Sequence, residues 1–419
     1  MKLELTREQA GVADAINQWF AQAYGYGGSL TLGGYAGTGK TTLLGLIKDF
    51  LPRGTRIVFA SFTGKAVSVL RSKLPGDAEV STLHRLLYRP RHKVICIESG
   101  EELIELPSQC EKHTGKKHVV FPEDGPRFVE LKMCDPRKAL DWSPVMNPLA
   151  NYDLVIVDEA SMVSEKIWSD LTKWGVPVLA VGDHGQLAPV KDTFNLMANP
   201  QLRLETILRQ AEGNPIIRMA TLARTTGHIP IAEYGPGCVK MAPFKRNQAL
   251  ERLRPEKGDL ALCSFNKTRT SLNLNLRKRV VSPPDGDPVI DDIVICLRNS
   301  YEAMIFNGMR GKIRDLGPLS DYGPQRFAEI SLLDEDYSFE GEISTEQFGQ
   351  QKTLSDVPRR LNLFDYGYAM TVHKAQGSEA DRVLVVEERF PRDGDDFHAR
   401  LLYTAVTRAR RSLCVVGPA

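Results

Sequence analysis

The stretch SLTLGGYAGTGKTTLLGLIKDF, residues 29–50, constrains the fold of this chain more than any other. Gly34 to Thr41 has the spacing GxxxxGK[ST] between a short apolar strand and a helical pattern, the context that a phosphate-binding loop requires. Glycines let the backbone N–H groups of such a loop turn inward on phosphates, and the helix that follows adds partial positive charge. The segment therefore predicts an α/β domain with a nucleotide site at the end of a strand.

Each position of this loop has an expected part in nucleotide binding. The Lys40 ammonium would reach the β- and γ-phosphates, and the Thr41 hydroxyl would coordinate Mg²⁺. The residues that we expect to contact the nucleotide are Gly34, Ala36, Gly37, Thr38, Gly39, Lys40, Thr41 and Thr42.

Two adjacent carboxylates end a later apolar run, LVIVDEAS, residues 154–161. We expect Asp158 to be the second Mg²⁺ anchor and Glu159 to polarise the attacking water. The alternative is a solvated acidic pair, which does not explain why four apolar residues directly precede both carboxylates. With the phosphate loop, the pair indicates ATP hydrolysis with ATP and Mg²⁺ as cofactors.

The rest of the chain alternates apolar strand-like runs with helical patterns, which favours an α/β fold with parallel sheets. The further runs are at 56–61, 153–161, 176–183, 260–265, 382–386 and 413–417. Two stretches break this rhythm, at 89–148 and 289–360, and we interpret each as an insertion. The first contains two β-like runs around a Pro-Glu-Asp-Gly turn, which predicts a hairpin at 116–133.

Net charge and cysteine content limit the kinds of partner and the cellular compartment that we expect. A net charge of +2 means that any site for a polyanion is a local stripe. The seven cysteines form no CxxC pair, which is typical of reduced thiols, and the N-terminus has no signal-peptide layout. We expect a protein of the cytoplasm, bacterial or of a phage-infected cell, with no membrane contact. Cys96, Cys110, His113 and Cys134 share the first insertion, but their spacing fits no standard zinc site.

Three more motifs follow in order: VGDHGQLAPV at 181–190, TVHKAQGSEAD at 371–381 and LLYTAVTRARRS at 401–412. With the two above, they resemble superfamily 1 helicases of the 5′-to-3′ branch, the RecD-like group that includes phage Dda-type enzymes. The resemblance runs from about Leu5 to Val416, apart from the insertions. It implies two RecA-like P-loop motor domains with ATP between them, a pin-like β-hairpin insertion in the first and an SH3-like β insertion in the second.

The domain boundaries that follow from this resemblance alternate along the chain. Motor domain 1A would comprise 1–88 and 147–199, with insertion 1B at 89–146. Motor domain 2A would comprise 200–281 and 364–419, with insertion 2B at 282–363.

The resemblance also assigns nucleotide contacts outside the loop. Gln186 would sense the γ-phosphate, Arg209 and Arg408 would be arginine fingers, and Glu379 would lie near the nucleotide. Gln9 would read adenine, although Thr6-x-x-Gln9 is also a capping box. Arg408 would share a helix with two further arginines at 410 and 411, a pattern that is also typical of a solvated face.

Single-stranded DNA would cross both motor domains. The expected contacts are Thr63, Lys65, Thr82, His84, Asn266, Thr371 and His373, with Gln376 coupling the nucleotide to this path. Hydroxyls, amides and imidazoles contact phosphate and sugar without reading sequence. In the hairpin, Phe121 or Phe128 would stack on a base at the duplex junction, or else both would only pack the hairpin.

The implied activity is ATP-dependent 5′-to-3′ translocation on single-stranded DNA with unwinding at fork junctions, by a monomer. One alternative is a DNA-stimulated translocase that displaces bound proteins with little strand separation. Another is a nucleotide-gated DNA-binding switch. Nothing in the sequence identifies a reader of the 2′-hydroxyl, so an RNA substrate stays open.

Overall fold

The computed structural model divides the chain into two units, Met1–Leu83 with Asn151–Ala419, and His84–Ala150. No helix among the described residues is long and apolar enough to cross a membrane. The described residues are 5–96, 102–103, 118–120, 127–129, 136–188, 194–208, 213–282, 286–300, 303, 305–321, 323–333, 337–355, 357–358, 361–390 and 394–418.

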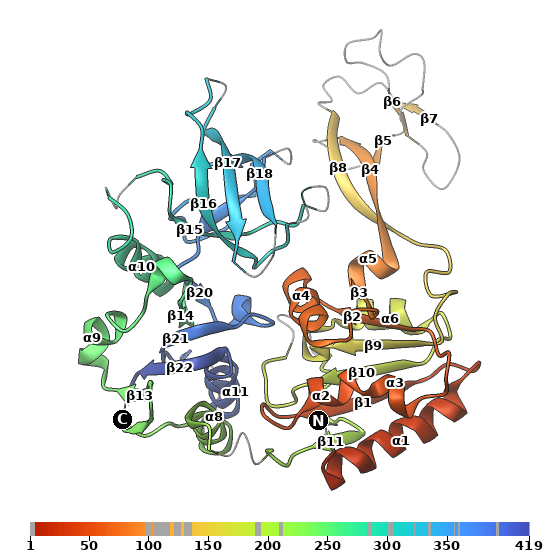
Figure 1. Ribbon diagram of the computed structural model, residues 1–419. Coiled ribbons are helices and arrows are strands. Elements are labelled where there is room, and N and C mark those ends of the chain that lie inside the picture. The colour runs from red at the N-terminus through yellow and green to blue at the C-terminus, as the bar shows by residue number, and fades with distance from the viewer. Residues whose placement is uncertain are drawn as a thin grey trace. The chain divides into compact units, whose positions relative to one another are not determined.

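The first sheet of the larger unit is six-stranded and wholly parallel, in the order β11-β1-β10-β9-β2-β3 (Figure 1). Its central strands are almost entirely buried, which confirms the prediction from continuous apolar runs. The strands are β1 (Ser29–Gly34), β2 (Ile57–Ser61), β3 (Glu79–Thr82), β9 (Leu154–Asp158), β10 (Val178–Gly182) and β11 (Leu202–Leu204).

Helices pack on this sheet and with it form what we call the first domain. Helix α1 begins with the Thr6–Gln9 capping box and buries Val12, Ile16 and Phe20 against the sheet. The helical run expected after the phosphate loop is divided into two short helices at Leu46. The helices are α1 (Arg7–Ala23), α2 (Lys40–Gly45), α3 (Ile47–Phe50), α4 (Gly64–Lys73) and α6 (Glu165–Thr172).

A second six-stranded sheet, in the order β12-β13-β22-β21-β14-β20, is parallel except for β12. With its helices it forms the second domain. Helix α8 shows how the sequence sets its ends, because Asn214 caps it, Pro215 follows, and Gly227 closes it with φ +65°. The strands are β12 (Glu233–Gly235), β13 (Cys238–Met241), β14 (Leu260–Cys263), β20 (Ala369–Thr371), β21 (Ala380–Val386) and β22 (Ala409–Val416). The helices are α8 (Pro215–Thr226), α9 (Arg246–Leu250), α10 (Asn266–Arg277) and α11 (Asp395–Val406).

The second insertion is a five-stranded antiparallel sheet. A fully buried ion pair joins α10 to the residue just before the first strand of this sheet, because the Arg277 guanidinium contacts Asp292 at 2.9 Å. Arg310 donates to the Gly258 carbonyl at 2.7 Å, which ties the sheet to the residues before β14. The strands are β15 (Ile293–Cys296), β16 (Arg310–Leu316), β17 (Gln325–Leu332), β18 (Ser338–Ser344) and β19 (Phe364–Tyr366), the last lying just past the expected end at 363.

The smaller unit contains a long antiparallel ladder between β4 (Tyr88–Cys96) and β8 (Pro136–Pro144), with β5 (Glu102–Leu103) on its edge. Helix α5 (Leu83–Leu87) precedes it. The predicted hairpin is present as the antiparallel pair β6 (His118–Val120) and β7 (Arg127–Val129). Its turn, including Phe121, lies outside the described residues, as do the side chains of Phe128, Cys96, Cys110, His113 and Cys134.

Candidate nucleotide and nucleic-acid site

The phosphate loop follows β1 and has the backbone that its glycines permit. Gly37 and Gly39 both have φ +83°, in the left-handed region that favours glycine. The Lys40 ammonium donates to the carbonyls of Gly34 and Tyr35, the latter at 3.1 Å. The Thr38 hydroxyl donates to the Tyr35 carbonyl at 2.9 Å and closes the loop on itself.

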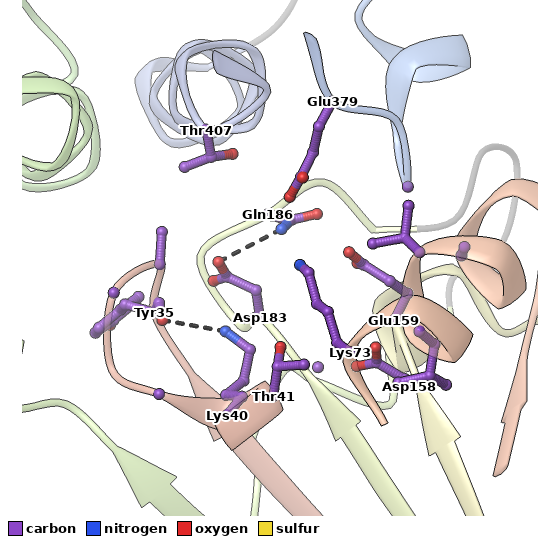
Figure 2. Close-up of a pocket in the computed structure, with 18 of the residues that line it drawn as sticks. Tyr35, Lys40, Thr41, Lys73, Asp158, Glu159, Asp183, Gln186, Glu379 and Thr407 are labelled. Carbon is purple, nitrogen blue, oxygen red and sulfur yellow. Dashed lines mark hydrogen bonds between the residues drawn. The ribbon is translucent and has the colours of Figure 1, made fainter. Parts of the chain in front are cut away.

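A pocket of about 450 Å³ lies at this loop and draws its lining from both domains. Strands β1, β10 and β9 are parallel neighbours, so the residues that follow them meet at one edge of the sheet. Figure 2 shows Lys40, Asp158, Glu159, Gln186 and Glu379 around this space. The predicted residues that line it are Ala36, Gly37, Gly39, Lys40, Thr41, Thr42, Asp158, Glu159, Gln186, Glu379 and Arg408.

Burial dominates the electrostatics of the acidic pair. It raises the pKa of the Asp158 carboxyl, which the nearby Lys40 charge opposes. It also raises the pKa of the Glu159 carboxyl, which Arg408 opposes. Glu159 has φ +52°, one of three described non-glycine residues with a positive φ. Strained backbone and perturbed acids cluster at functional sites, so both observations mark this strand end as one.

Gln9 takes part in two contacts at once. Its Oε1 accepts from the Thr6 backbone N–H in the capping box, and its Nε2 donates to the Thr38 carbonyl of the phosphate loop at 3.2 Å. The capping-box interpretation is therefore confirmed, and the same side chain reaches the loop. Adenine recognition by Gln9 remains a prediction.

Arg408 is buried and faces the pocket, so the solvated-face alternative does not apply to it. The expectation that it shares a helix with Arg410 and Arg411 is wrong, because α11 ends at Val406 and β22 begins at Ala409. The Arg408 guanidinium donates to the Thr404 carbonyl at 3.0 Å. Arg209 lies outside the described residues.

Sequence reasoning missed Lys73, the last residue of α4, whose side chain points into the pocket (Figure 2). Burial works to raise the pKa of Glu379, but Lys73 and a hydrogen bond from Arg410 hold it below its ordinary value. Asp183 was also missed, although it stands in the quoted motif; its carboxylate accepts from the Gln186 amide at 3.4 Å. No motif spacing marks Lys73, since only the packing of α4 brings it here.

Four of the predicted DNA contacts lie at the carboxyl edges of the parallel strands in the two domains. Thr63 follows β2 and Thr82 ends the neighbouring β3. In the second domain Asn266 follows β14 and Thr371 ends the neighbouring β20. Thr63 also caps α4 by accepting from the Ala66 N–H at 3.1 Å, so its hydroxyl has a structural partner.

The other predicted contacts differ in what their side chains touch. The His373 ring stacks on Phe397 with centroids 6.2 Å apart. The buried Gln376 amide donates to the Leu187 carbonyl at 3.1 Å and so bridges the two domains. Burial lowers the pKa of His84 in the smaller unit. Lys65 lies in α4, and its side chain is outside the described set.

Family comparison agrees with this arrangement. A family model described as an AAA domain matches residues 17–235, and one described as a UvrD-like helicase C-terminal domain matches residues 366–416. The ATP-dependent RecD2 DNA helicase of Deinococcus radiodurans is 32% identical over 293 residues, which cover 64% of this chain and 37% of that protein. The RecBCD enzyme subunit RecD of Mycolicibacterium smegmatis is 25% identical over 438 residues, covering 93% of this chain and 68% of that protein.

Solved structures show the same fold. Pif1 helicases described at forked double-stranded DNA superpose with a TM-score of 0.56 at 16% identity, covering 100% of this chain and 95% of theirs. Pif1 helicase from Bacteroides in complex with ADP-AlF3 and single-stranded DNA gives a TM-score of 0.54 at 17% identity and the same coverage. The match spans only 37% of the length of the RecD2 relative, and only 25% of the length of a further relative, the probable conjugal transfer protein TraA of Sinorhizobium fredii. Since the AAA-domain match covers more than half of the chain, the chain belongs to that family, and the helicase C-terminal match with the RecD2 relative identifies it as a superfamily 1 helicase of the RecD-like branch.

Proposed function

We propose that the chain is an ATP-dependent DNA helicase that moves 5′-to-3′ on single-stranded DNA and unwinds duplex ahead of it. One observation carries this: a single pocket receives the phosphate loop and acidic pair of the first domain and Arg408 of the second. A nucleotide-gated switch needs neither a base such as Glu159 nor an arginine facing it. The RecD2 relative is named as an ATP-dependent DNA helicase, which supports the same activity.

Hydrolysis would use the residues of this pocket in distinct roles. Loop amides and Lys40 hold the phosphates, and Glu159 polarises the attacking water. Gln186 Oε1 has no hydrogen-bond partner among the described residues, so it is available to orient that water or to sense the γ-phosphate. Arg408 would neutralise charge that develops on the transferred phosphoryl group, with Arg209 as a second finger.

The donor set fits Mg²⁺. The Thr41 hydroxyl and the Asp158 carboxylate both line the pocket, and oxygen donors are the ligands that this cation prefers. A bound cation would also relieve the desolvation cost of ionising the half-buried Asp158. When bound it neutralises phosphate charge, and Thr41 with Asp158 would hold it.

DNA would lie across the carboxyl edges of both parallel sheets, on the threonine, asparagine and histidine side chains described above. Pif1 helicases of the same fold are described unwinding forked double-stranded DNA and bound to single-stranded DNA, which supports this path. We further propose that the hairpin is a pin, that the antiparallel insertion is SH3-like, and that the domain boundaries are those expected from the sequence. The active form would be a monomer in the cytoplasm.

ATP hydrolysis with and without single-stranded DNA tests the proposal, together with unwinding of 5′-tailed and 3′-tailed duplexes. We expect DNA-stimulated hydrolysis and unwinding from the 5′ tail alone, and neither activity in Lys40→Ala. Stimulated hydrolysis without unwinding would indicate a translocase. Hydrolysis that DNA does not stimulate would contradict the DNA path, and unwinding from the 3′ tail alone would contradict the direction.

A further inference from the structure

Two side chains of the second domain bind the start of the phosphate loop. The Tyr403 hydroxyl accepts a hydrogen bond from the Ala36 N–H at 2.8 Å and donates one to Asp183 Oδ2 at 2.7 Å. The Arg224 guanidinium carbon lies 3.6 Å from the centroid of the Tyr35 ring, a cation–π contact. Tyr35 and Ala36 thereby pack against the hydrophobic core of the second domain.

Two side chains of α11 form hydrogen bonds with residues before and after Gln186. Arg400, one turn before Tyr403, donates to the His184 carbonyl at 2.9 Å. Thr404 Oγ1 accepts from the Leu187 N–H at 3.1 Å. The first domain therefore meets α11 through both its phosphate loop and the segment that carries Gln186.

The same helix sets the place of Arg408. Its guanidinium donates to the carbonyl of Thr404, one turn earlier in the chain. Any shift of α11 relative to the phosphate loop would consequently move Arg408 relative to the γ-phosphate position.

A phenylalanine ring at position 403 would not make the two hydrogen bonds of the Tyr403 hydroxyl. Its side chain is almost fully buried, and burial together with Asp183 raises the pKa of the phenol well above its ordinary value. The proton thus stays on the oxygen and is donated to Asp183, while the oxygen accepts from Ala36. Phenylalanine would leave a buried N–H and a buried carboxylate without these partners.

We propose that Tyr403 is a positioning residue for ATP hydrolysis. Its hydroxyl fixes α11 on the phosphate loop, so that Arg408 and Gln186 meet the γ-phosphate together. This role rests on the proposed function and deepens it. Because the phosphate loop of the first domain makes the ground-state contacts, loss of the hydroxyl should act on kcat and leave KM for ATP nearly unchanged.

Steady-state hydrolysis by Tyr403→Phe in saturating single-stranded DNA tests this role. We expect kcat to fall by about tenfold or more with KM for ATP within about twofold. Tyr368→Phe is the matched control, because Tyr368 is also fully buried and donates to a carboxylate, Asp292 at 2.8 Å, away from the pocket. The control should keep the kcat of the unmodified protein even where its melting temperature falls.

A double-substitution cycle separates positioning from general damage. If Tyr403 acts in part through Arg408, Tyr403→Phe should cause a smaller loss of kcat in an Arg408→Ala background than in the unmodified protein. Two results would overturn this role if the unmodified protein shows DNA-stimulated hydrolysis. One is an unchanged kcat in Tyr403→Phe, and the other is an equal loss of kcat from Tyr403→Phe in both backgrounds. An unmodified protein without DNA-stimulated hydrolysis would overturn the proposed function, and this role with it.

Discussion

At the scale of single residues, Glu159 shows a conflict between stability and chemistry. Its carboxyl is half-buried at the pocket, its pKa is raised by desolvation and also by the neighbouring Asp158, and its backbone has φ +52°. Ionising such a carboxyl in the protein without nucleotide costs more free energy than ionising an exposed one. This cost falls on the residue that we propose as the base, and catalytic sites commonly carry such perturbed acids.

Glu159→Gln should therefore separate activity from stability. We expect kcat to fall by about 100-fold or more, because the water loses its base. The free energy of unfolding at pH 7 should equal or exceed that of the unmodified protein. Since the folded pKa of Glu159 is raised, the unmodified protein regains stability as pH falls through that pKa, and the difference between the two proteins should shrink.

Denaturant unfolding across pH, with the exposed Glu251→Gln as control, measures this effect. The control should change neither kcat nor the pH dependence of stability. Marked destabilisation of Glu159→Gln at pH 7 would show that the carboxylate is needed for folding and contradict the argument.

At the scale of elements, prediction succeeded where burial leaves a pattern in the sequence. Strands β2, β9 and β10 are apolar up to their last residues because the sheet is covered on both faces. The long β4–β8 ladder was not predicted, since it joins residues far apart in the chain. The end of α11 was missed because the polar residues after Val406 carry no glycine or proline to stop a helix.

A close contact between elements gives a prediction at this scale. Gly64 begins α4, and a Cβ built there would lie 2.6 Å from Cγ of Phe306 in the antiparallel insertion. Gly64→Ala should consequently lower the free energy of unfolding by about 1–3 kcal/mol, the usual cost of overpacking, despite alanine's better helix propensity.

Gly76→Ala is the matched control, because nothing lies within 4 Å of a Cβ at that position. Equilibrium unfolding of both variants is the measurement. If Gly64→Ala were as stable as Gly76→Ala, Phe306 would not be held against α4 in solution.

At the scale of the whole molecule, the site depends on how two domains pack, which motif spacing does not encode. Lys40, Asp158 and Glu159 were predictable because each ends a buried strand or follows one. Lys73, Tyr403 and the Arg224–Tyr35 contact were not, since each arises only when α4, α8 and α11 come together around the pocket.

The pocket lining lies entirely within Met1–Leu83 and Asn151–Ala419, whereas the β6–β7 hairpin belongs to the other unit. Hydrolysis and strand separation should therefore be separable in one variant. Replacing 122–126 by a short Gly-Ser link should leave DNA-stimulated hydrolysis within about twofold. Unwinding of a 5′-tailed duplex should fall by about tenfold, because the turn that would hold Phe121 or Phe128 against a base is lost, and such a stacking contact contributes about 1–3 kcal/mol. Lys40→Ala, which should lose both activities, is the control. Full unwinding by the hairpin variant would assign strand separation to another element, and a parallel loss of hydrolysis would show that the hairpin supports the motor itself.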